Sequence, residues 1–351
     1  MDKINKRSYY KGLFFILVLG LGFLIFFVST LGAAKISFLD SVHIILGKIP
    51  GIRRLISIAD YPPSHVTIIW KIRLPRIILA LFVGMGLSIV GATFQGLFKN
   101  PMADPHVLGV SSGAALGAVI AIVSGLTGSF MGQNIVGVLA FIGALTTTWI
   151  VYYIAKVGHK VPTVTLLLAG IALSFFLSAM ISAIITFNLN QMEQIVFWTM
   201  GSLAAARWEQ VYFVAPLILF GSVMIFLFSR ELNGMLLGDE SAKSLGIDVE
   251  RTKKILLIIA SLMVAATVSA SGIIGFVGLI IPHAVRMVVG PDHRNLLPFS
   301  ALIGGIFMIL CDTLARVIVP PMEVPVGVVT ALLGAPYFIY LLYQHKKQVL
   351  G

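Results

Sequence analysis

The sequence predicts an all-α fold, a polytopic membrane protein with about ten transmembrane helices. Hydrophobic residues make up 58% of the 351-residue chain and charged residues only 11%, against about 45–50% and about 25% in soluble domains. Apolar runs of about 20 residues, the length that a helix needs to cross a bilayer, recur along the whole chain. The strands of about ten alternating residues that predict a transmembrane barrel are absent. With no internal duplication and no soluble segment, residues 1–351 form one predicted membrane domain.

The first half of the chain holds five of the expected helices, at residues 12–31, 74–98, 107–126, 136–155 and 164–187. The first run ends in small residues that resemble a signal-peptidase site. It is longer than the apolar core of about 7–15 residues in a signal peptide, so we expect a retained helix. Pro62 and Pro63 break any long helix in the polar segment 35–71. The segment K-N-P-M-A-D-P (Lys99–Pro105) ends the second helix.

The second half holds the other five expected helices, at residues 211–228, 255–270, 271–288, 297–319 and 326–343. Residues 188–209 are expected to form a polar connection that carries aromatic side chains at its tip. Residues 271–288 are expected to form a shorter helix interrupted by glycines and Pro282, with freed backbone groups that are tolerated only inside a bundle. The lone Cys311 lies in an apolar run, so it predicts a small hydrophobic side chain rather than a disulfide framework.

Basic residues set the expected orientation. Lys3, Lys6, Arg7 and Lys11 place the N-terminus in the cytoplasm by the positive-inside rule. Alternation from there puts 16 of the 25 Lys and Arg residues inside, together with the C-terminal tail. The net charge of +11 is spread between apolar runs and forms no stripe, so we expect no nucleic-acid partner. The membrane lipid is the expected surrounding.

The first external segment is unexpectedly basic. Two explanations stay open: an anionic substrate or acidic docking partner, or solvated charge with snorkelling at the interface. The basic residues in or beside this segment are Lys35, Lys48, Arg53, Arg54, Lys71, Arg73 and Arg76.

Charged residues, which are rare in this chain, are concentrated in the stretch Arg230–Lys254. Of the 14 Asp and Glu residues in the chain, five fall here, and the expected topology makes it the largest cytoplasmic loop. No G-x-x-x-x-G-K-[ST] phosphate cradle occurs anywhere, so the chain is not expected to bind ATP by that device.

Few residues suggest chemistry inside the membrane. Gln95 and Asn100 are polar in an apolar setting and should face protein or a cavity rather than lipid. Asp312 and Arg316, four residues apart, are within ion-pairing reach on one helical face; a functional and a structural pair are equally open. The histidines show no metal-ligand spacing, and no catalytic grouping is present. We therefore expect neither a metal site nor an enzyme. One class of protein that stays open is a secondary transporter driven by protons or sodium ions, with Asp312 and Arg316 as the ion relay.

Several motifs in order resemble the FecCD-type permeases of ABC importers for iron-siderophores, haem and cobalamin. The resemblance runs from about Arg73 to Tyr343. It rests on R-L-P-R (Arg73–Arg76), F-Q-G-L-F-K-N-P-M-A-D-P-H-V-L-G-V-S-S-G-A (Phe94–Ala114), L-L-L-A-G (Leu166–Gly170), W-T-M-G-S-L (Trp198–Leu203), L-G-D-E-S-A-K-S-L-G (Leu237–Gly246), G-F-V-G-L-I-I-P-H-A-V-R (Gly275–Arg286), G-P-D-H-R (Gly290–Arg294), D-T-L-A-R (Asp312–Arg316) and E-V-P-V-G-V-V-T-A-L-L-G-A-P (Glu323–Pro336).

The resemblance implies a type II ABC importer permease fold in the cytoplasmic membrane of a prokaryote. Its expected partners are a second permease subunit (a copy or a sibling), two cytoplasmic ATPase subunits that carry ATP and Mg, and an extracytoplasmic binding protein. No cofactor is expected in this chain. The commonest cargo in such a family is an iron-siderophore, with haem and cobalamin behind it.

The resemblance also implies roles for individual residues. Arg73, Arg76 and Arg316 match arginines that receive acidic residues of the binding protein. Asn100, Met102, Pro162 and Thr163 match gate loops of the translocation path, to which we add the polar Gln95; Pro162 stands where a relative has a hydroxyl residue. The residues that match the ATPase-coupling helices are Leu237, Gly238, Asp239, Glu240, Ser241, Ala242, Lys243, Ser244, Leu245 and Gly246.

Overall fold

The computed structural model describes residues 3–32, 34–49, 51, 60–126, 128–130, 133–158, 160–319 and 321–350. All ten expected helices are present, and the all-α prediction is confirmed. Seven are long and apolar enough to cross a membrane, and three more are shorter apolar helices. The ten are α1 (Lys3–Thr30), α4 (Leu74–Leu97), α5 (Val110–Val123), α6 (Ile135–Ala155), α7 (Thr163–Phe187), α9 (Trp208–Leu227), α12 (Val249–Ser271), α13 (Val277–Val289), α14 (His293–Val317) and α15 (Val326–Leu350).

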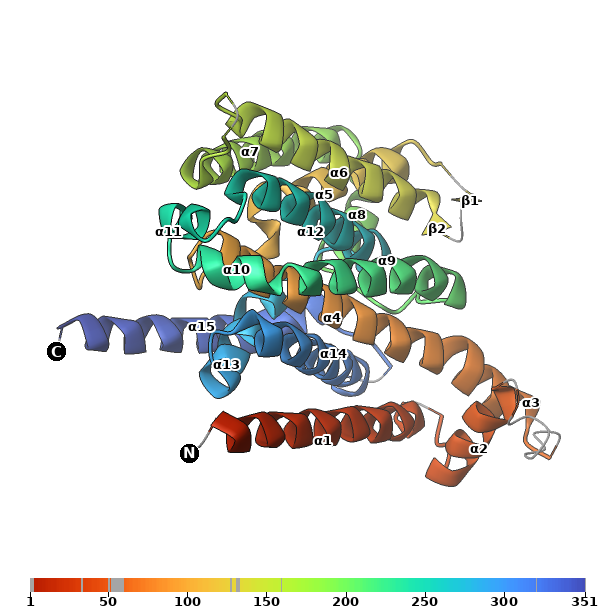
Figure 1. Ribbon diagram of the computed structural model, residues 1–351. Coiled ribbons are helices and arrows are strands. Elements are labelled where there is room, and N and C mark those ends of the chain that lie inside the picture. The colour runs from red at the N-terminus through yellow and green to blue at the C-terminus, as the bar shows by residue number, and fades with distance from the viewer. Residues whose placement is uncertain are drawn as a thin grey trace.

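Shorter elements connect these helices at the two ends of the bundle. The only strands in the described residues, β1 (Ser129–Phe130) and β2 (Gln133–Asn134), form an antiparallel hairpin. The short helical elements are α2 (Phe38–Lys48), α3 (Pro63–Thr67), the π-helix η1 (Ile68–Arg73), the 3-10 helices η2 (Pro105–Leu108) and η3 (Leu189–Gln191), α8 (Met192–Thr199), α10 (Ser229–Met235) and α11 (Asp239–Ser244). In Figure 1, α2, α3 and the hairpin lie at one end, whereas α10, α11 and both chain termini lie at the other.

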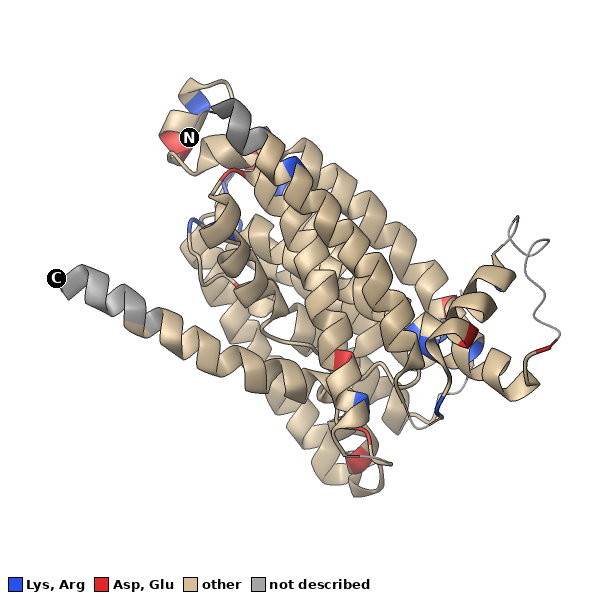
Figure 2. Cartoon of the chain, turned by 90° about the horizontal axis from the view of Figure 1, so that it is seen from below, with Lys and Arg blue, Asp and Glu red and all other residues tan. Residues whose placement is uncertain are grey.

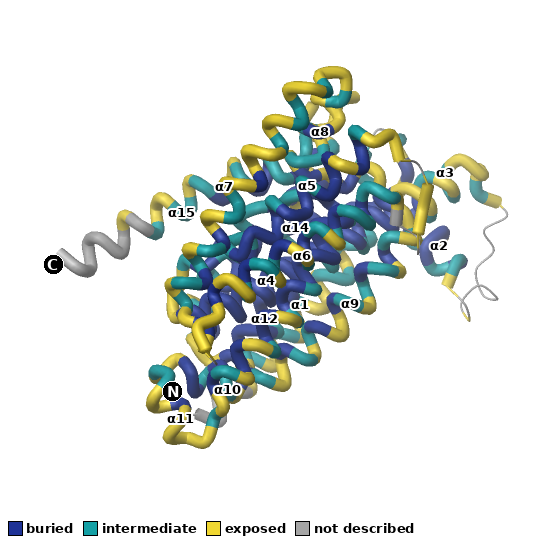
Figure 3. Tube along the Cα trace, turned by 90° about the horizontal axis from the view of Figure 1, so that it is seen from above, coloured by how far each residue is buried: buried dark blue, intermediate teal, exposed yellow. Residues whose placement is uncertain are grey.

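Three helices form the centre of the bundle. Figure 3 shows α4, α12 and α14 as the most buried, with other helices around them. Of the apolar stretch in Pro63–Leu97, 78% is buried, against 11% in α1 and 17% in α7. The outer helices therefore expose apolar side chains, as lipid-facing helices do.

Glycines bring the central helices into backbone contact. A methyl group at Gly84 of α4 would collide with the backbone of Gly304 in α14, and one at Gly91 would collide with Gly278 in α13. These glycines therefore serve close packing of the helices.

Four sequence expectations need correction. α12 begins at Val249 rather than at 255, because Asp248 caps it and its charged first turns lie outside the apolar run. Residues 271–288 do not form one interrupted helix: α13 starts only at Val277, and Pro282 lies inside it. The polar segment 35–71 and the connection 188–209 contain the unexpected helices α2 and α8.

Some expectations fall on residues that the structure does not describe. Arg53, Arg54 and His159 lie outside the described residues. The side chains of Lys3, Lys6 and Arg7 and of the tail residues 345–347 lie outside them as well.

Candidate functional site

The short helix α11 projects from the bundle end that also holds α10 and the start of α12 (Figure 1). Gly238 (φ 112°) precedes it and Gly246 (φ 81°) follows it. Side chains with a Cβ rarely adopt such backbone angles, so the two glycines allow the chain to turn out and back within ten residues. Ala242 is fully buried and fixes the inner face of α11.

The outer face of this segment combines apolar and charged side chains. Leu237 is 69% exposed and Leu245 is 64% exposed, one on each side of α11. Glu240 and Lys243 are exposed between them. Apolar side chains exposed with charged neighbours are typical of a protein contact. The ten residues Leu237–Gly246 thus form one surface, although they hold a single six-residue helix and not the helix pair expected from the sequence.

Asp239 anchors this surface to two central helices. Its carboxylate accepts hydrogen bonds from Lys253 Nζ in α12 (2.7 Å) and from Lys99 Nζ just after α4 (2.5 Å). Partial burial acts to raise the pKa of Asp239, but the hydrogen bonds and charges of the two lysines outweigh it, so the pKa is lowered. The carboxylate is therefore charged at neutral pH and holds both partners.

A second link joins α10 to α14 and α4. Asn233 in α10 donates through Nδ2 to Asp292 Oδ1 (2.6 Å) and accepts from the backbone N of His293 (2.8 Å). His293 is fully buried, and its ring lies so close to Gly96 of α4 that no side chain fits there. α10 is thus fixed to the start of α14 and the end of α4. The sequence alone assigned no role to Asn233 or His293, although His293 lies inside the motif Gly290–Arg294 and Asn233 lies in the charged stretch Arg230–Lys254.

The predicted gate residues lie on two loops at the same end. Asn100 and Met102 follow α4, and the Asn100 side chain accepts from the backbone N of Met102 (2.9 Å). Pro162 and Thr163 start α7, where Val161 N donates to Glu250 Oε2 of α12 (3.2 Å). Their gate role stays a prediction.

Gln95 faces protein rather than lipid, as the sequence suggested. It is buried in α4, and its Nε2 donates to the Leu279 carbonyl of α13 (3.0 Å). The proline break in α13 is nearby, because Pro282 has no N–H to donate to the Gly278 carbonyl, one residue before Leu279. Gln95 therefore supplies a donor beside this weakened turn.

The three predicted docking arginines lie near the opposite end of the bundle. Figure 2 shows the charged residues gathered at the two ends, with long uncharged stretches between. Arg76 Nε donates to both oxygens of Asp312 (3.0 and 2.9 Å), and Arg76 Nη1 donates to Glu323 Oε2 (2.8 Å). The expected pair of Arg316 and Asp312 is present at 3.5 Å, but Arg76 on α4 is the closer partner.

Arg73 has backbone partners. It donates to the carbonyls of Ser29 (2.8 Å), Thr30 (3.1 Å) and Ala34 (2.7 Å) at the end of α1. All three arginine side chains are largely buried, and Arg316 Nη2 has no hydrogen-bond partner among the described residues. Their docking role stays a prediction.

Comparison with known proteins gives consistent matches along the chain. The sequence profile of the FecCD transport family matches residues 18–344. The cobalamin import system permease protein BtuC of Halobacterium salinarum is 47% identical over 82% of this chain and 77% of its own length. The hemin transport system permease protein HmuU of Yersinia pestis is 42% identical over 81% of this chain and 85% of its own.

A solved structure has the same architecture. It is reported as an inward-facing conformation of a metal-chelate type ABC transporter. It superposes with a TM-score of 0.81 at 32% identity, covering 95% of this chain and 99% of its own.

Proposed function

The chain belongs to the FecCD transport family, and we propose that it is the transmembrane permease subunit of an ATP-driven importer for a metal chelate. The permease class is supported by the family match and by the bundle of apolar helices. The observation that carries the energy coupling is Leu237–Gly246: an exposed surface outside the apolar helices, anchored through Asp239 to α12 and to the end of α4.

ATP acts on this protein through other chains. No phosphate cradle occurs in the sequence, so two partner ATPase subunits bind ATP with Mg. Leu237 and Leu245 enter a groove of the ATPase, and the charged residues between them set the register. This chain makes and breaks no covalent bond.

Transport proceeds by alternating access. Movement of α11 reaches α12 and the end of α4 through Asp239, and movement of α10 reaches α14 through Asn233 and His293. α4 and α14 meet again near the other end of the bundle, where Arg76 binds Asp312. Because glycine contacts pack the two helices closely, they move as one body rather than bend independently.

The proposal also includes an orientation and two further kinds of partner. The end that holds α11 is cytoplasmic, with both chain termini, in the cytoplasmic membrane of a prokaryote; the distribution of Lys and Arg supports this orientation. A second permease, a copy or a sibling, completes the path, and an extracytoplasmic binding protein delivers cargo at the end that holds Arg76 and Arg316.

The cargo is a metal chelate. An iron-siderophore is the commonest assignment in the family, but the two relatives reported above are named for cobalamin and hemin. These two names favour a tetrapyrrole chelate ahead of an iron-siderophore for this chain. An ion-driven secondary transporter is less well supported, because Asp312, the candidate relay, is buried between two arginines.

Transport by proteoliposomes tests this function. The chain is reconstituted with its partner ATPase and binding protein, and uptake of cyanocobalamin, haemin and a ferric hydroxamate is measured with and without ATP. We expect ATP-dependent uptake of one of them. Equal uptake without ATP, driven by a proton or sodium gradient, would show that the rival class is right.

A further inference from the structure

A cavity of about 480 Å³ lies between α6 and α12, near the bundle end that holds α11. Its walls are largely apolar: Leu145 comes from α6, Leu257 from α12 and Leu166 from the start of α7. A water molecule needs two to four polar partners to stay in such a space. Apolar side chains make up most of these walls, with polar groups at Thr148, Tyr152, Lys254 and Ser261, so the cavity suits a largely apolar occupant with a polar end.

The cavity opens toward the outer surface of the bundle. Trp149 of α6 and Ile258 of α12 both line it, yet Trp149 is 66% exposed and Ile258 is 59% exposed. Large apolar side chains exposed in the middle of a transmembrane helix face lipid. An acyl chain can therefore enter the cavity sideways from the bilayer.

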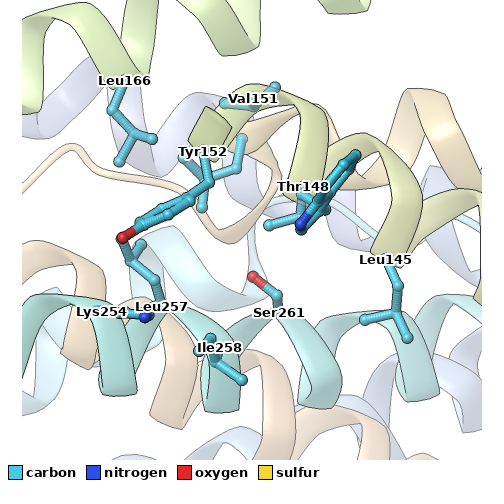
Figure 4. Close-up of a pocket in the computed structure, with 11 residues that line it drawn as sticks. Leu145, Thr148, Val151, Tyr152, Leu166, Lys254, Leu257, Ile258 and Ser261 are labelled. Atoms are coloured by element: carbon cyan, nitrogen blue, oxygen red, sulfur yellow. The ribbon is translucent and has the colours of Figure 1, made fainter. Parts of the chain in front are cut away.

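A buried hydroxyl points into this space. Ser261 of α12 is 3% exposed, and its Oγ has no hydrogen-bond partner among the described residues. Figure 4 shows this oxygen directed from α12 toward α6, into the cavity. A buried hydroxyl without a partner is costly in an apolar setting, so an occupant that accepts a hydrogen bond there is favoured.

One end of the cavity is basic. Lys254 lines it and is exposed, and seven residues separate it from Ser261, about 10 Å along the helix axis. The Tyr152 hydroxyl reaches toward the same end from α6 (Figure 4). Lys156 and Lys160, which follow α6, are also exposed. The distance between the Lys254 charge and the Ser261 hydroxyl is therefore similar to the thickness of the interfacial layer of a bilayer, which is about 5–8 Å in each leaflet.

We propose that this cavity binds one anionic phospholipid from the leaflet at the α11 end. Lys254 binds the phosphate, Ser261 donates to an ester carbonyl of the glycerol, and one acyl chain fills the space between Leu145 and Leu257. Basic pockets between transmembrane helices select anionic headgroups in this way. The inference rests on the membrane location of the chain and is independent of its cargo.

Native mass spectrometry tests the site. The full-length chain in detergent is offered equal amounts of dioleoyl phosphatidylglycerol and dioleoyl phosphatidylcholine, and the ratio of the two bound lipids is measured. We expect one bound lipid, mostly phosphatidylglycerol. Lys254→Gln lowers the bound ratio about fivefold, the effect of one lysine near an anionic surface. The matched control Arg294→Gln removes an exposed basic residue at the same end that does not line the cavity, and leaves the ratio unchanged.

Two variants fill the cavity from opposite walls. Ser261→Phe and Leu145→Trp should each abolish the bound lipid, and either suffices if the other fails to fold, as judged by size-exclusion chromatography. The proposal is overturned if both lipids bind equally well to the unmodified chain. It is also overturned if Lys254→Gln and Arg294→Gln give the same ratio, or if folded cavity-filling variants keep the lipid.

Discussion

Lys99 and Asp239 are 140 residues apart in the sequence, yet their side chains form an ion pair of 2.5 Å. Lys253 completes the arrangement on the second oxygen of the same carboxylate. One aspartate at the start of a six-residue surface helix thus binds a residue after α4 and a residue in α12. We propose that this carboxylate is the point where force from an ATPase enters the helix bundle.

Asp239→Asn should uncouple transport from ATP hydrolysis. The amide keeps the shape but weakens both links to lysine. Partly exposed ion pairs contribute about 0.2–1 kcal/mol each, so we expect a small loss of thermal stability. A loss of about 1 kcal/mol corresponds to about a fivefold change, and we expect uptake to fall by more than that. Uptake and ATPase activity are measured on the same proteoliposomes. Lys99→Gln alone and combined with Asp239→Asn completes a double-mutant cycle, and additive effects on uptake would contradict the link.

The stabilising effect of Asp239 should depend on pH only in acid. Its pKa is lowered in the folded chain, so its contribution is complete above the ordinary aspartate value of about 3.9 and is lost as the pH falls through the lowered value. The difference in Tm between the unmodified chain and Asp239→Asn should therefore be constant from about pH 8 to pH 5 and shrink below about pH 4. Thermal unfolding across this range measures it, and a difference that already shrinks between pH 7 and pH 5 would refute the expectation.

Leu245→Asp should separate the permease from its ATPase. Leu245 is 64% exposed, so the substitution should have little effect on folding. A central contact residue of an interface contributes about 2 kcal/mol or more, and its loss weakens docking about 30-fold. Co-purification and equilibrium binding of the ATPase measure the effect. Leu245→Ala keeps part of the same side chain and should weaken docking less, so it serves as the graded comparison.

Asp312→Asn should destabilise the bundle strongly. Asp312 is 1% exposed and carries the charge that faces both Arg76 and Arg316. Removing one partner of a buried pair costs about 3–5 kcal/mol. Arg76→Met combined with Asp312→Leu should cost less than the sum of the single changes, because it removes both charges of the closer pair and leaves only Arg316 without its carboxylate. Thermal unfolding in detergent decides this, and strictly additive losses would count against it.

Arg316→Gln should weaken docking of the binding protein. Arg316 Nη2 is buried and has no hydrogen-bond partner among the described residues, so an acidic side chain that reached it would supply the partner that it lacks. Charge attraction across a surface is screened by salt, and the loss of affinity should be greater at low ionic strength. Surface plasmon resonance at several salt concentrations measures it. Unchanged affinity at low salt, with an unchanged Tm, would remove Arg316 from the docking site.

Hydropathy was enough to locate the seven long helices, because each covers about 30 Å of hydrocarbon with its own side chains. The three shorter helices were found from their apolar runs. Hydropathy could not locate the start of α12. Asp248 caps that helix, and its charged first turns extend beyond the apolar run, so the run begins later than the helix. α2 and α8 were missed for a related reason: both are short and lie in segments read as polar connections.

The site was predicted as a segment but not as a network. The range Leu237–Gly246 came from its motif, and its exposure agrees with a surface role. The partners of Asp239 and Asn233 could not be predicted, because each pairs across 14 to 140 residues with positions that no local pattern connects. The i,i+4 pair of Asp312 and Arg316 was found because helix geometry alone places it, whereas Arg76, 236 residues away, was not.

The distance in sequence between Arg76 and Asp312 has a consequence for biogenesis. A ribosome that adds about 5–20 residues per second takes roughly 10 to 50 s to travel the 236 residues between them. During that time α4 is already made, but its arginine has no carboxylate to bind. Arg76 is the third residue of α4, so its side chain can snorkel to the headgroup region until α14 arrives. The nascent chain therefore inserts a cation whose carboxylate partners, Asp312 and Glu323, are synthesised much later, and the core closes only near the end of translation.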